Sequence, residues 1–234
     1  MNKKTYLFLL FSCFLCTPFF AQQQKVHNQP YGDQKLYHFG IIVGINFQDL
    51  ILTNNGLPAG NETWYATIPN YTPGLSVGLL ADMYLNPFMN LRLSPALHFG
   101  DKNFEFVEPA TGQHVNSMVR SSYITLPLDL KIRSLRLNNY RPYLIAGVFG
   151  ALDLGLKKDD PILLKPFDYG FNIGFGCDFY LPIVKIAPEL RFSFGLTDLI
   201  EHNRTDLTEK DKEKYSKAIA KGVSRMITLT LNFE

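Results

Sequence analysis

Cysteine is scarce in this sequence. Its 234 residues include three cysteines, Cys13, Cys16 and Cys177, and the first two lie in the export signal described below. A mature chain with one cysteine cannot form an intramolecular disulfide, although export would take it to a compartment where disulfides form. The fold must therefore be held together by hydrogen bonds and side-chain packing.

Long apolar runs are missing after residue 21. No uninterrupted hydrophobic stretch there approaches the roughly 18 residues that a membrane-spanning helix needs. If the mature chain enters a membrane, it must do so as strands. Net charge is low as well, because the formal charge of +2 falls to neutral when the two lysines of residues 1–21 are removed. A neutral chain gives no support for nucleic acid as a partner.

Residues 1–21 have the layout of a secretory signal peptide. Lys3 and Lys4 form the basic end, residues 6–20 form the apolar core, and Ala21 ends the expected cleavage site. The alternative, a lipoprotein signal that uses Cys13, would leave an unusually short apolar core. We therefore expect cleavage near Ala21, a polar periplasmic extension over residues 22–35, and a single domain over residues 36–234.

Two adjacent segments between residues 167 and 196 alternate between apolar and polar residues. In the first segment the apolar face is formed by Phe171, Ile173, Phe175, Cys177 and Phe179. A turn around residues 181–182 follows, and the alternation resumes up to Phe194 with charged residues on the second face. The apolar face of such a hairpin meets either a second apolar layer in a soluble sandwich or lipid in a membrane barrel.

Six further segments have a similar pattern. They predict strands at residues 36–47, 73–84, 91–106, 117–133, 140–152 and 223–233. In the third of these, Pro95 counts against a regular ladder because it has no amide hydrogen. The segment 140–152 is the least decisive, because Tyr143 lies on one face while Leu144 and Val148 lie on the other.

The connections between the eight segments alternate between long and short. Long loops are expected at residues 48–72, 107–116, 153–166 and 197–221, the last with a short helix over 208–221, and short turns near 86–87, 135–139 and 181–182. Outer-membrane barrels have short periplasmic turns and long external loops, whereas a soluble sandwich has no reason to sort its loops by length. The sequence therefore predicts an all-β fold, an eight-stranded antiparallel up-and-down transmembrane β-barrel, with outer-membrane lipid against its apolar face.

Charged residues fall on the inward face of this predicted barrel. The inner faces carry eight of them: Arg92, Asp129, Lys131, Arg133, Asp178, Lys185, Glu189 and Arg191. In a narrow barrel we expect them to pair with one another, because an unpaired buried charge is costly. We interpret them as a structural network of ion pairs in the lumen, and a path for protons, ions or a ligand is the alternative.

Several chemical motifs stand in the wrong structural context for catalysis. Residues 74–78 match the Gly-x-Ser-x-Gly pattern, but Ser76 lies within a strand and not at a strand-to-helix turn. Ser94 and His98 share an inner face, yet a four-residue offset along a strand is too long for a direct hydrogen bond. The five histidines show no metal-ligand spacing. The sequence therefore predicts no catalytic residue, no cofactor and no metal site.

Two strand segments also resemble a known family. Residues 123–131 read Tyr-Ile-Thr-Leu-Pro-Leu-Asp-Leu-Lys and residues 141–147 read Arg-Pro-Tyr-Leu-Ile-Ala-Gly, and in this order they resemble the outer-membrane β-barrel domains of Bacteroidetes. With residues 90–100, the chain is most similar to the PorT family of type IX secretion barrels. The resemblance implies a non-enzymatic role in exporting cargo, with other secretion-system proteins as partners through periplasmic turns, loops or the N-terminal segment. It assigns no functional residue.

Two other classes of function stay open on the sequence alone. One is a barrel enzyme that modifies outer-membrane lipid or peptides through inward serine and histidine residues. The other is a barrel that binds ligands or surfaces through its long loops, the first of which includes residues 54–70.

Overall fold

The computed structural model describes residues 28–54, 65–67, 72–108, 113–155, 164–201 and 219–234. These residues form one short 3-10 helix, η1 (Gly32–Gln34), and ten strands. The strands are β1 (Tyr37–Asn54), β2 (Tyr65–Thr67), β3 (Pro73–Asn86), β4 (Met89–Leu93), β5 (Ala96–Glu108), β6 (Gln113–Arg133), β7 (Tyr140–Asp153), β8 (Phe167–Tyr180), β9 (Lys185–Gly195) and β10 (Ile219–Phe233). Within the described ranges there is no helix of the length and apolar character needed to cross a membrane.

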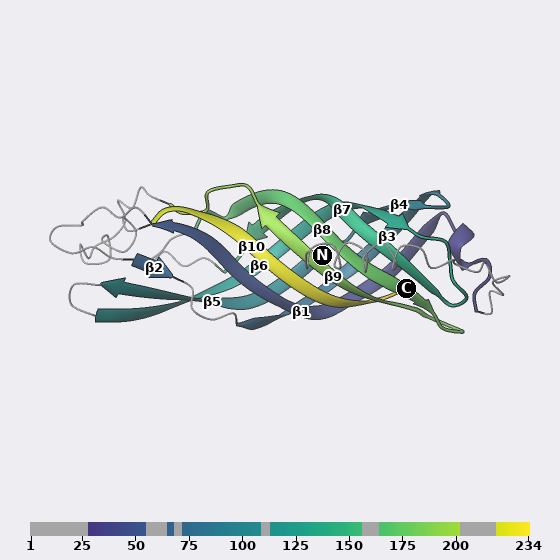
Figure 1. Cartoon of the computed structure of the whole chain (residues 1–234), viewed down its shortest axis with the longest axis horizontal. Coiled ribbons are helices and arrows are strands. Elements are labelled where there is room, and N and C mark those ends of the chain that lie inside the picture. Colours follow the sequence, from purple (N-terminus) through teal and green to yellow (C-terminus); the bar gives the residue numbers. More distant parts are fainter. Residues whose placement is uncertain (1–27, 55–64, 68–71, 109–112, 156–163, 202–218) are drawn as a thin grey trace, which may run out of the picture.

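The strands close into one antiparallel barrel (Figure 1). β1 pairs with β3 on one side and with β10 on the other, so the sheet returns to its start. β4 and β5 are two pieces of one wall strand, because both pair with β3 and β6. Pro95 lies at the break between them, as expected for a residue that cannot donate to the ladder. The described wall therefore has eight strands, and the predicted eight-stranded up-and-down barrel is confirmed.

Apolar side chains cover the outside of the barrel, and polar side chains fill the inside. On β8, Phe171, Ile173 and Phe175 are exposed, whereas Asn172 and Asp178 are buried. Aromatic and β-branched residues fit the pleated surface of a strand. A band of them around a closed sheet gives the apolar surface that lipid requires, and pairing around the ring gives the backbone amides of the strands hydrogen-bond partners.

The strand that the sequence left undecided, β7, has both an apolar outer face and a partly apolar inner face. Leu144 and Val148 are exposed on the outside, and Tyr143, Ile145 and Phe149 are buried in the lumen. The lumen is therefore filled by large side chains as well as by charges, which is the way a small barrel fills its interior.

The predicted bounds of two connections are wrong. Residues 107–108 and 113–116 of the expected loop 107–116 belong to β5 and β6, which stay paired as far as Glu108 and Gln113. β1 likewise runs on to Asn54, inside the expected loop 48–72, because it stays paired with β10. Strand pairing thus continues beyond the length that is needed to cross a membrane. The alternation of apolar and polar residues identifies the part of a strand that lies in the membrane, but it does not show where the pairing of two strands ends.

The helix expected at residues 208–221 lies mostly outside the described residues. Its last three positions, 219–221, belong to β10, and Gly222, the expected end of the helix, lies within that strand. This part of the prediction is wrong because the partner strand β1 extends far enough to pair with residues 219–222.

The two ends of the barrel differ. Short turns join β3 to β4, β6 to β7 and β8 to β9 at one end, and in outer-membrane barrels short turns face the periplasm. In the β6–β7 turn Asn138 has a φ of 56°, a conformation that asparagine tolerates better than most residues. Residues 28–34 lie at this same end, against these turns. The predicted signal peptide and residues 22–27 lie outside the described residues.

Candidate functional site

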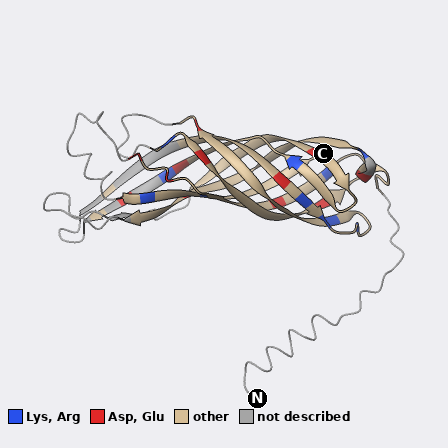
Figure 2. Ribbon diagram, turned by 90° about the horizontal axis from the view of Figure 1, so that it is seen from above, with Lys and Arg blue, Asp and Glu red and all other residues tan. Residues whose placement is uncertain are grey.

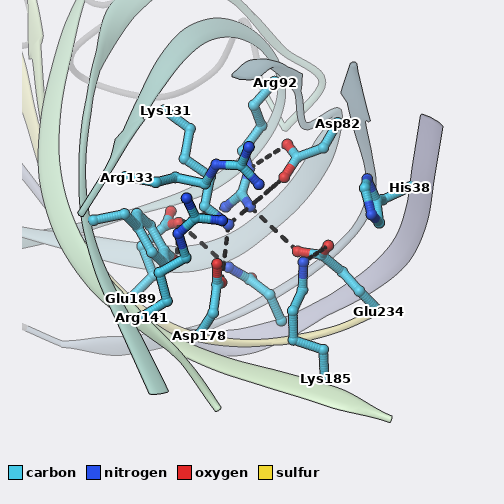
Figure 3. Close-up of polar contacts among 12 residues, drawn as sticks. His38, Asp82, Arg92, Lys131, Arg133, Arg141, Asp178, Lys185, Glu189 and Glu234 are labelled. Atoms are coloured by element: carbon cyan, nitrogen blue, oxygen red, sulfur yellow. Dashed lines mark hydrogen bonds and ion pairs between the residues drawn. The ribbon is translucent and has the colours of Figure 1, made fainter. Parts of the chain in front are cut away.

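Arg92, on β4, lies at the centre of the charged groups inside the barrel. It binds Asp82 with two hydrogen bonds, from Nε to Oδ1 at 2.7 Å and from Nη2 to Oδ2 at 2.8 Å. Nη1 donates to Glu189 Oε2 at 2.7 Å, and Nη2 lies 3.3 Å from Glu234 Oε1. Figure 3 shows these carboxylates around the guanidinium. The planar fork of arginine suits such paired contacts better than a lysine would.

Lys131, on β6, joins a second pair of carboxylates. Its Nζ lies 2.9 Å from Asp178 Oδ1 and 3.6 Å from Asp82 Oδ2. The same ammonium lies 4.0 Å from the centre of the Tyr143 ring, where the negative face of the ring attracts a cation. Lys131 therefore links β6 to β8 and β3 through contacts made entirely inside the barrel.

Arg191, on β9, bridges two further carboxylates. Its Nη2 lies 3.0 Å from Asp129 Oδ2 and 3.0 Å from Glu189 Oε1. Asn172 donates to Asp129 at 3.2 Å, and the Tyr143 hydroxyl donates to Glu189 at 2.9 Å. These neutral donors satisfy lone pairs that the arginine leaves free, as buried carboxylates require.

Lys185 and Glu234 complete the network with a close ion pair. We call the connected charges the ionic plug, which consists of Asp82, Arg92, Asp129, Lys131, Asp178, Lys185, Glu189, Arg191 and Glu234. Four cations meet five carboxylates, so the charges nearly cancel. Burying each charge costs desolvation free energy, and pairing with opposite charges offsets that cost. The near balance of charges therefore allows nine charged residues to lie together in the lumen.

The ionic plug closes the lumen near its periplasmic end. Arg92, Lys131 and Asp178 expose none of their surface to solvent, and Asp82 and Glu189 expose 1% and 2%. Figure 2 shows charged residues gathered near the end of the barrel where the C-terminal end of the chain lies. Side chains buried to this degree fill the lumen at this level, on the side of the short turns.

A closed barrel with an apolar outer surface and a charged interior is typical of outer-membrane proteins, and a family match agrees with this. The model of a family described as "Outer membrane protein beta-barrel domain" matches residues 20–201. This chain belongs to that family. It is an outer-membrane β-barrel protein, and its apolar band lies against the lipid of that membrane.

Several solved structures are similar to this outer-membrane β-barrel protein. OprG from Pseudomonas aeruginosa has 12% identity and a TM-score of 0.48 over 83% of this chain and 93% of its own. Neisserial surface protein A has 10% identity and a TM-score of 0.44 over 85% and 98%. AlkL, determined in lipid bilayers, has 13% identity and a TM-score of 0.42 over 93% and 95%. A search of curated proteins gave no match.

Residues 28–34, which we call the latch, cover the periplasmic end of the barrel. Asn28 donates to the Tyr180 carbonyl at 2.9 Å, and Gln29 donates to the Leu181 carbonyl at 2.8 Å. Arg136 in the β6–β7 turn donates in return to the Gln29 carbonyl at 3.0 Å and to the Asn28 carbonyl. Part of the predicted polar extension is thus bound to the barrel, as a second closure below the ionic plug.

Asp33 is the charged contact of the latch. Its Oδ1 lies 3.2 Å from Arg141 and 3.6 Å from Arg133, its Oδ2 lies 3.6 Å from Arg136, and Tyr180 donates to Oδ1 at 2.5 Å. Burial alone would raise the pKa of this carboxyl, but the tyrosine hydrogen bond and the arginine charges outweigh burial and lower the pKa below its ordinary 3.8.

Seven of the eight predicted lumen charges belong to the ionic plug. The eighth, Arg133, lies instead in the cluster around Asp33 and stacks 5.7 Å from the Tyr84 ring. The sequence-based set lacked Asp82, although the alternation of its strand places it inward, and it also lacked Asp33, Arg141 and Glu234. Asp33 and Glu234 lie outside the strands, where alternation gives no direction, whereas Arg141 follows the alternation of β7 and shares its buried face with Tyr143.

Ser76 and His98 form a pair that the sequence did not predict. Ser76 Oγ lies 2.8 Å from His98 Nδ1, and His98 Nε2 lies 2.9 Å from Thr125 Oγ1. The two residues are directly opposed on β3 and β5. Ser94 instead accepts hydrogen bonds from Arg191 at 3.3 Å. The structure therefore pairs His98 with the serine of the Gly-x-Ser-x-Gly pattern across the sheet.

The Ser76–His98 pair lacks two features of a nucleophilic site. Ser76 is completely buried, and the group that would orient the histidine is a threonine hydroxyl, not a carboxylate. Asn46 donates a further hydrogen bond to Ser76 Oγ at 2.9 Å, which makes a chain of neutral polar groups. Among the described residues there is also no group of three His, Cys, Asp or Glu side chains arranged to hold a metal ion.

Proposed function

We propose that this outer-membrane β-barrel protein is a non-enzymatic component of type IX protein secretion, which acts by binding other components at its periplasmic face. The proposal draws on the resemblance of residues 90–100, 123–131 and 141–147 to PorT-type barrels. The observation that carries it is the ionic plug. Because the plug closes the lumen, cargo does not pass through this barrel, and a contribution to export must be made by contact.

The periplasmic face offers apolar side chains for such contact. Phe88, Leu135 and Ile183 stand in the three short turns, and all are exposed, Ile183 to 95%. Tyr31 in the latch is 73% exposed at the same end. Apolar residues clustered at one end of a molecule, surrounded by polar groups, are typical of a protein-binding surface. The partner we propose is therefore a periplasmic protein or domain with a complementary apolar patch.

The proposal is tested in the native host with a strain that lacks the gene. The strain is complemented with the wild type, with Ile183→Arg at the periplasmic turn, or with Leu196→Arg at the opposite end, and secreted proteins are measured in the medium. Wild type and Leu196→Arg are expected to restore secretion, and Ile183→Arg to fail while its outer-membrane level stays normal. Normal secretion without the gene would refute the role in secretion.

Affinity purification of the tagged barrel from these strains tests the mode of action. Periplasmic partners are expected to co-purify with wild type and Leu196→Arg and to be lost with Ile183→Arg. If Ile183→Arg keeps the same partners and the same level of secretion, the periplasmic turns are not the binding surface. The proposed mode of action, binding at the periplasmic face, would then be refuted.

A barrel enzyme is the second candidate, favoured only by the 2.8 Å contact between Ser76 and His98. Ser76→Ala would abolish modification of lipid A or peptide in the host, with Ser193→Ala as a control for the loss of another interior hydroxyl. We expect that cells with either variant show the same state of lipid A and peptide as cells with the wild type, because Ser76 is buried. A loss of modification in Ser76→Ala alone would establish the enzyme.

A further inference from the structure

Three arginines at the periplasmic end of the barrel share one carboxylate. Arg133 ends β6, Arg136 lies in the β6–β7 turn, and Arg141 is near the start of β7. In the described part of the chain, the carboxylate that pairs with them is that of Asp33 in the latch. Two of the three positive charges are therefore unbalanced within this cluster. In the ionic plug, by contrast, four cations meet five carboxylates.

The contacts of Asp33 with the three arginines are long. Its carboxylate oxygens lie 3.2 Å from Arg141 Nη1 and 3.6 Å from Nη1 of both Arg133 and Arg136. Charged N–H···O hydrogen bonds are typically about 2.7–2.9 Å long, and the bonds of the central arginine of the ionic plug have this length. The latch carboxylate therefore leaves room for closer contacts with the same guanidinium groups.

The barrel itself holds two of these guanidinium groups in place. Arg141 donates to the Ser134 carbonyl at 2.7 Å and to the Pro87 carbonyl at 2.5 Å. Arg133 donates to the Asn86 carbonyl at 3.3 Å. These carbonyls lie at the β3–β4 and β6–β7 turns and not in the latch, so the bonds remain when the latch leaves. Donors that are held in advance bind an anion with a smaller loss of conformational entropy.

The latch is a small segment that covers these arginines. Its helix η1 has three residues, and Gln29 has a φ of 47°, a left-handed conformation that is unfavourable for residues other than glycine. The side chains of the three arginines expose 2–8% of their surface, whereas that of Asp33 exposes 21%. The latch therefore lies between the arginines and the periplasm, and its departure exposes them to a carboxylate from another molecule.

We propose that the three arginines form a binding site for an acidic segment of a periplasmic protein, and that the latch is a built-in competitor for this site. The latch defines the class of ligand, because it is itself a peptide segment that places an aspartate among the arginines. An aspartate or glutamate of the partner replaces Asp33 and accepts closer hydrogen bonds. The exposed apolar residues of the same end, such as Leu135 and Ile183, then contact the partner around its carboxylate. The identity of the partner as a secretion component rests on the proposed function, whereas the site itself does not.

The site is tested by calorimetric titration of the purified full chain in detergent micelles. The probe is a synthetic peptide of residues 28–35, blocked at both ends so that Asp33 supplies its only carboxylate. The peptide is expected to bind the full chain with Asp33→Ala. It is expected to bind the wild type at least about tenfold more weakly, because the attached latch competes at a high effective concentration.

A second peptide tests the position of the carboxylate. It combines Asp33→Asn with Gln34→Asp, so the net charge is unchanged and the carboxylate is displaced by one residue. This peptide is expected to bind about tenfold or more weakly, because charged hydrogen bonds are lost. The proposal is overturned if the first peptide does not bind the Asp33→Ala chain, binds the wild type equally well, or binds no better than the second.

Three variants in the Asp33→Ala background assign the binding to the arginines. Arg141→Gln and Arg136→Gln are expected to weaken peptide binding about tenfold or more, and Lys221→Met, an exposed lysine of β10, to leave it unchanged. A shift in gel mobility on boiling verifies that each variant is folded. Arg136 lies in a turn, so its variant keeps the test open if Arg141→Gln does not fold. Unchanged affinity in a folded arginine variant would contradict the assignment.

Inorganic phosphate and acetate, titrated into the Asp33→Ala chain, separate a peptide site from a site for a small anion. Both are expected to bind at least about tenfold more weakly than the peptide, because they lack the polar contacts of residues 28 and 29 with the barrel. Phosphate that binds as tightly as the peptide would overturn the proposal of a protein partner. Failure of these titrations would leave the secretion role to be decided by the deletion strain.

Discussion

Arg92 and Asp82 face each other across the β3–β4 pair and form a two-pronged ion pair with contacts of 2.7 and 2.8 Å. Arg92 is also the residue through which Glu189 and Glu234 are joined to Asp82. A single guanidinium thus connects β3 and β4 with β9 and with the end of β10. Arg92 therefore holds the ionic plug together. A change in the charge of Arg92 or of its partners is expected to affect the strands on both sides of the barrel.

Replacing Asp82 by Asn is expected to lower the free energy of unfolding by about 3–5 kcal/mol, because it leaves Arg92 and Lys131 short of one buried carboxylate. Urea unfolding in detergent micelles, followed by tryptophan fluorescence or gel mobility, measures the change. The double variant Asp82→Leu with Arg92→Met removes both charges of the pair and is expected to recover part of the loss. A loss below about 1 kcal/mol for Asp82→Asn would show that the pair is not important for stability.

Gly176 makes room for the aromatic ring at the plug. A Cβ at this position would lie 2.5 Å from the Tyr143 ring and 2.7 Å from the Pro188 carbonyl oxygen. Gly176→Ala is therefore expected to destabilise the barrel by about 1–3 kcal/mol through overpacking. Gly150→Ala is the matched control, because a Cβ there meets no atom within 4 Å. Equal stability of the two alanine variants would contradict the described packing of Tyr143.

The lipid-facing side of β8 is tested by an arginine scan of two isoleucines. Ile173 lies at the middle of β8 and is 48% exposed on the apolar face, whereas Ile183 is 95% exposed in a periplasmic turn. In lipid vesicles Ile173→Arg is expected to cost about 2–4 kcal/mol and Ile183→Arg about 0–1 kcal/mol, since the cost of arginine falls with distance from the membrane centre. Similar costs at both positions would place the face of Ile173 outside the membrane.

The latch is expected to release in acid. Asp33 has a lowered pKa in the latched state, so its ionised form favours binding of the latch, and this contribution is complete above pH 3.8. It decreases as the pH falls from 3.8 through the lower pKa of the latched carboxyl, where protonation removes the charge that Arg141 and Arg133 attract.

A nitroxide label on Tyr31→Cys measures this release, in a chain whose three natural cysteines are replaced by serine. The label is expected to be restricted at pH 7 and to gain mobility progressively as the pH falls below 3.8 and passes the lowered pKa of the latched carboxyl. Asp33→Asn is the control, and its label should be mobile over the whole range. A label in the wild-type background that is as restricted at pH 2 as at pH 7 would show that the hydrogen bonds of Asn28 and Gln29 hold the latch without Asp33.

Alternation predicted the barrel wall well, and it predicted most of the plug. The period of two placed Arg92, Lys131 and Glu189 inside because one strand residue fixes the direction of the next. Pro95 was correctly identified as a break because the lack of an amide hydrogen is a local property.

Contacts between distant segments could not be predicted in the same way. Asp33 meets Arg133 and Arg141 only because the turns of the closed barrel bring them together, and its own segment has no periodic pattern. The contact of Ser76 with His98 depends on the register between β3 and β5, which is set by the whole sheet. The extension of β5 and β6 beyond the predicted strand ends depends on their pairing with each other. The sequence of either strand alone does not predict that extension.

Conductance across a planar lipid bilayer tests the central claim, that the ionic plug closes the lumen and the protein acts by binding. The full chain is inserted into the bilayer, insertion is verified by protease protection, and a general porin in the same bilayer verifies sensitivity. The structure predicts no stepwise current from the wild-type barrel at moderate voltage. A stable open channel from wild-type protein would contradict the account, because it would require a water-filled path through the level of Arg92, Lys131 and Asp178.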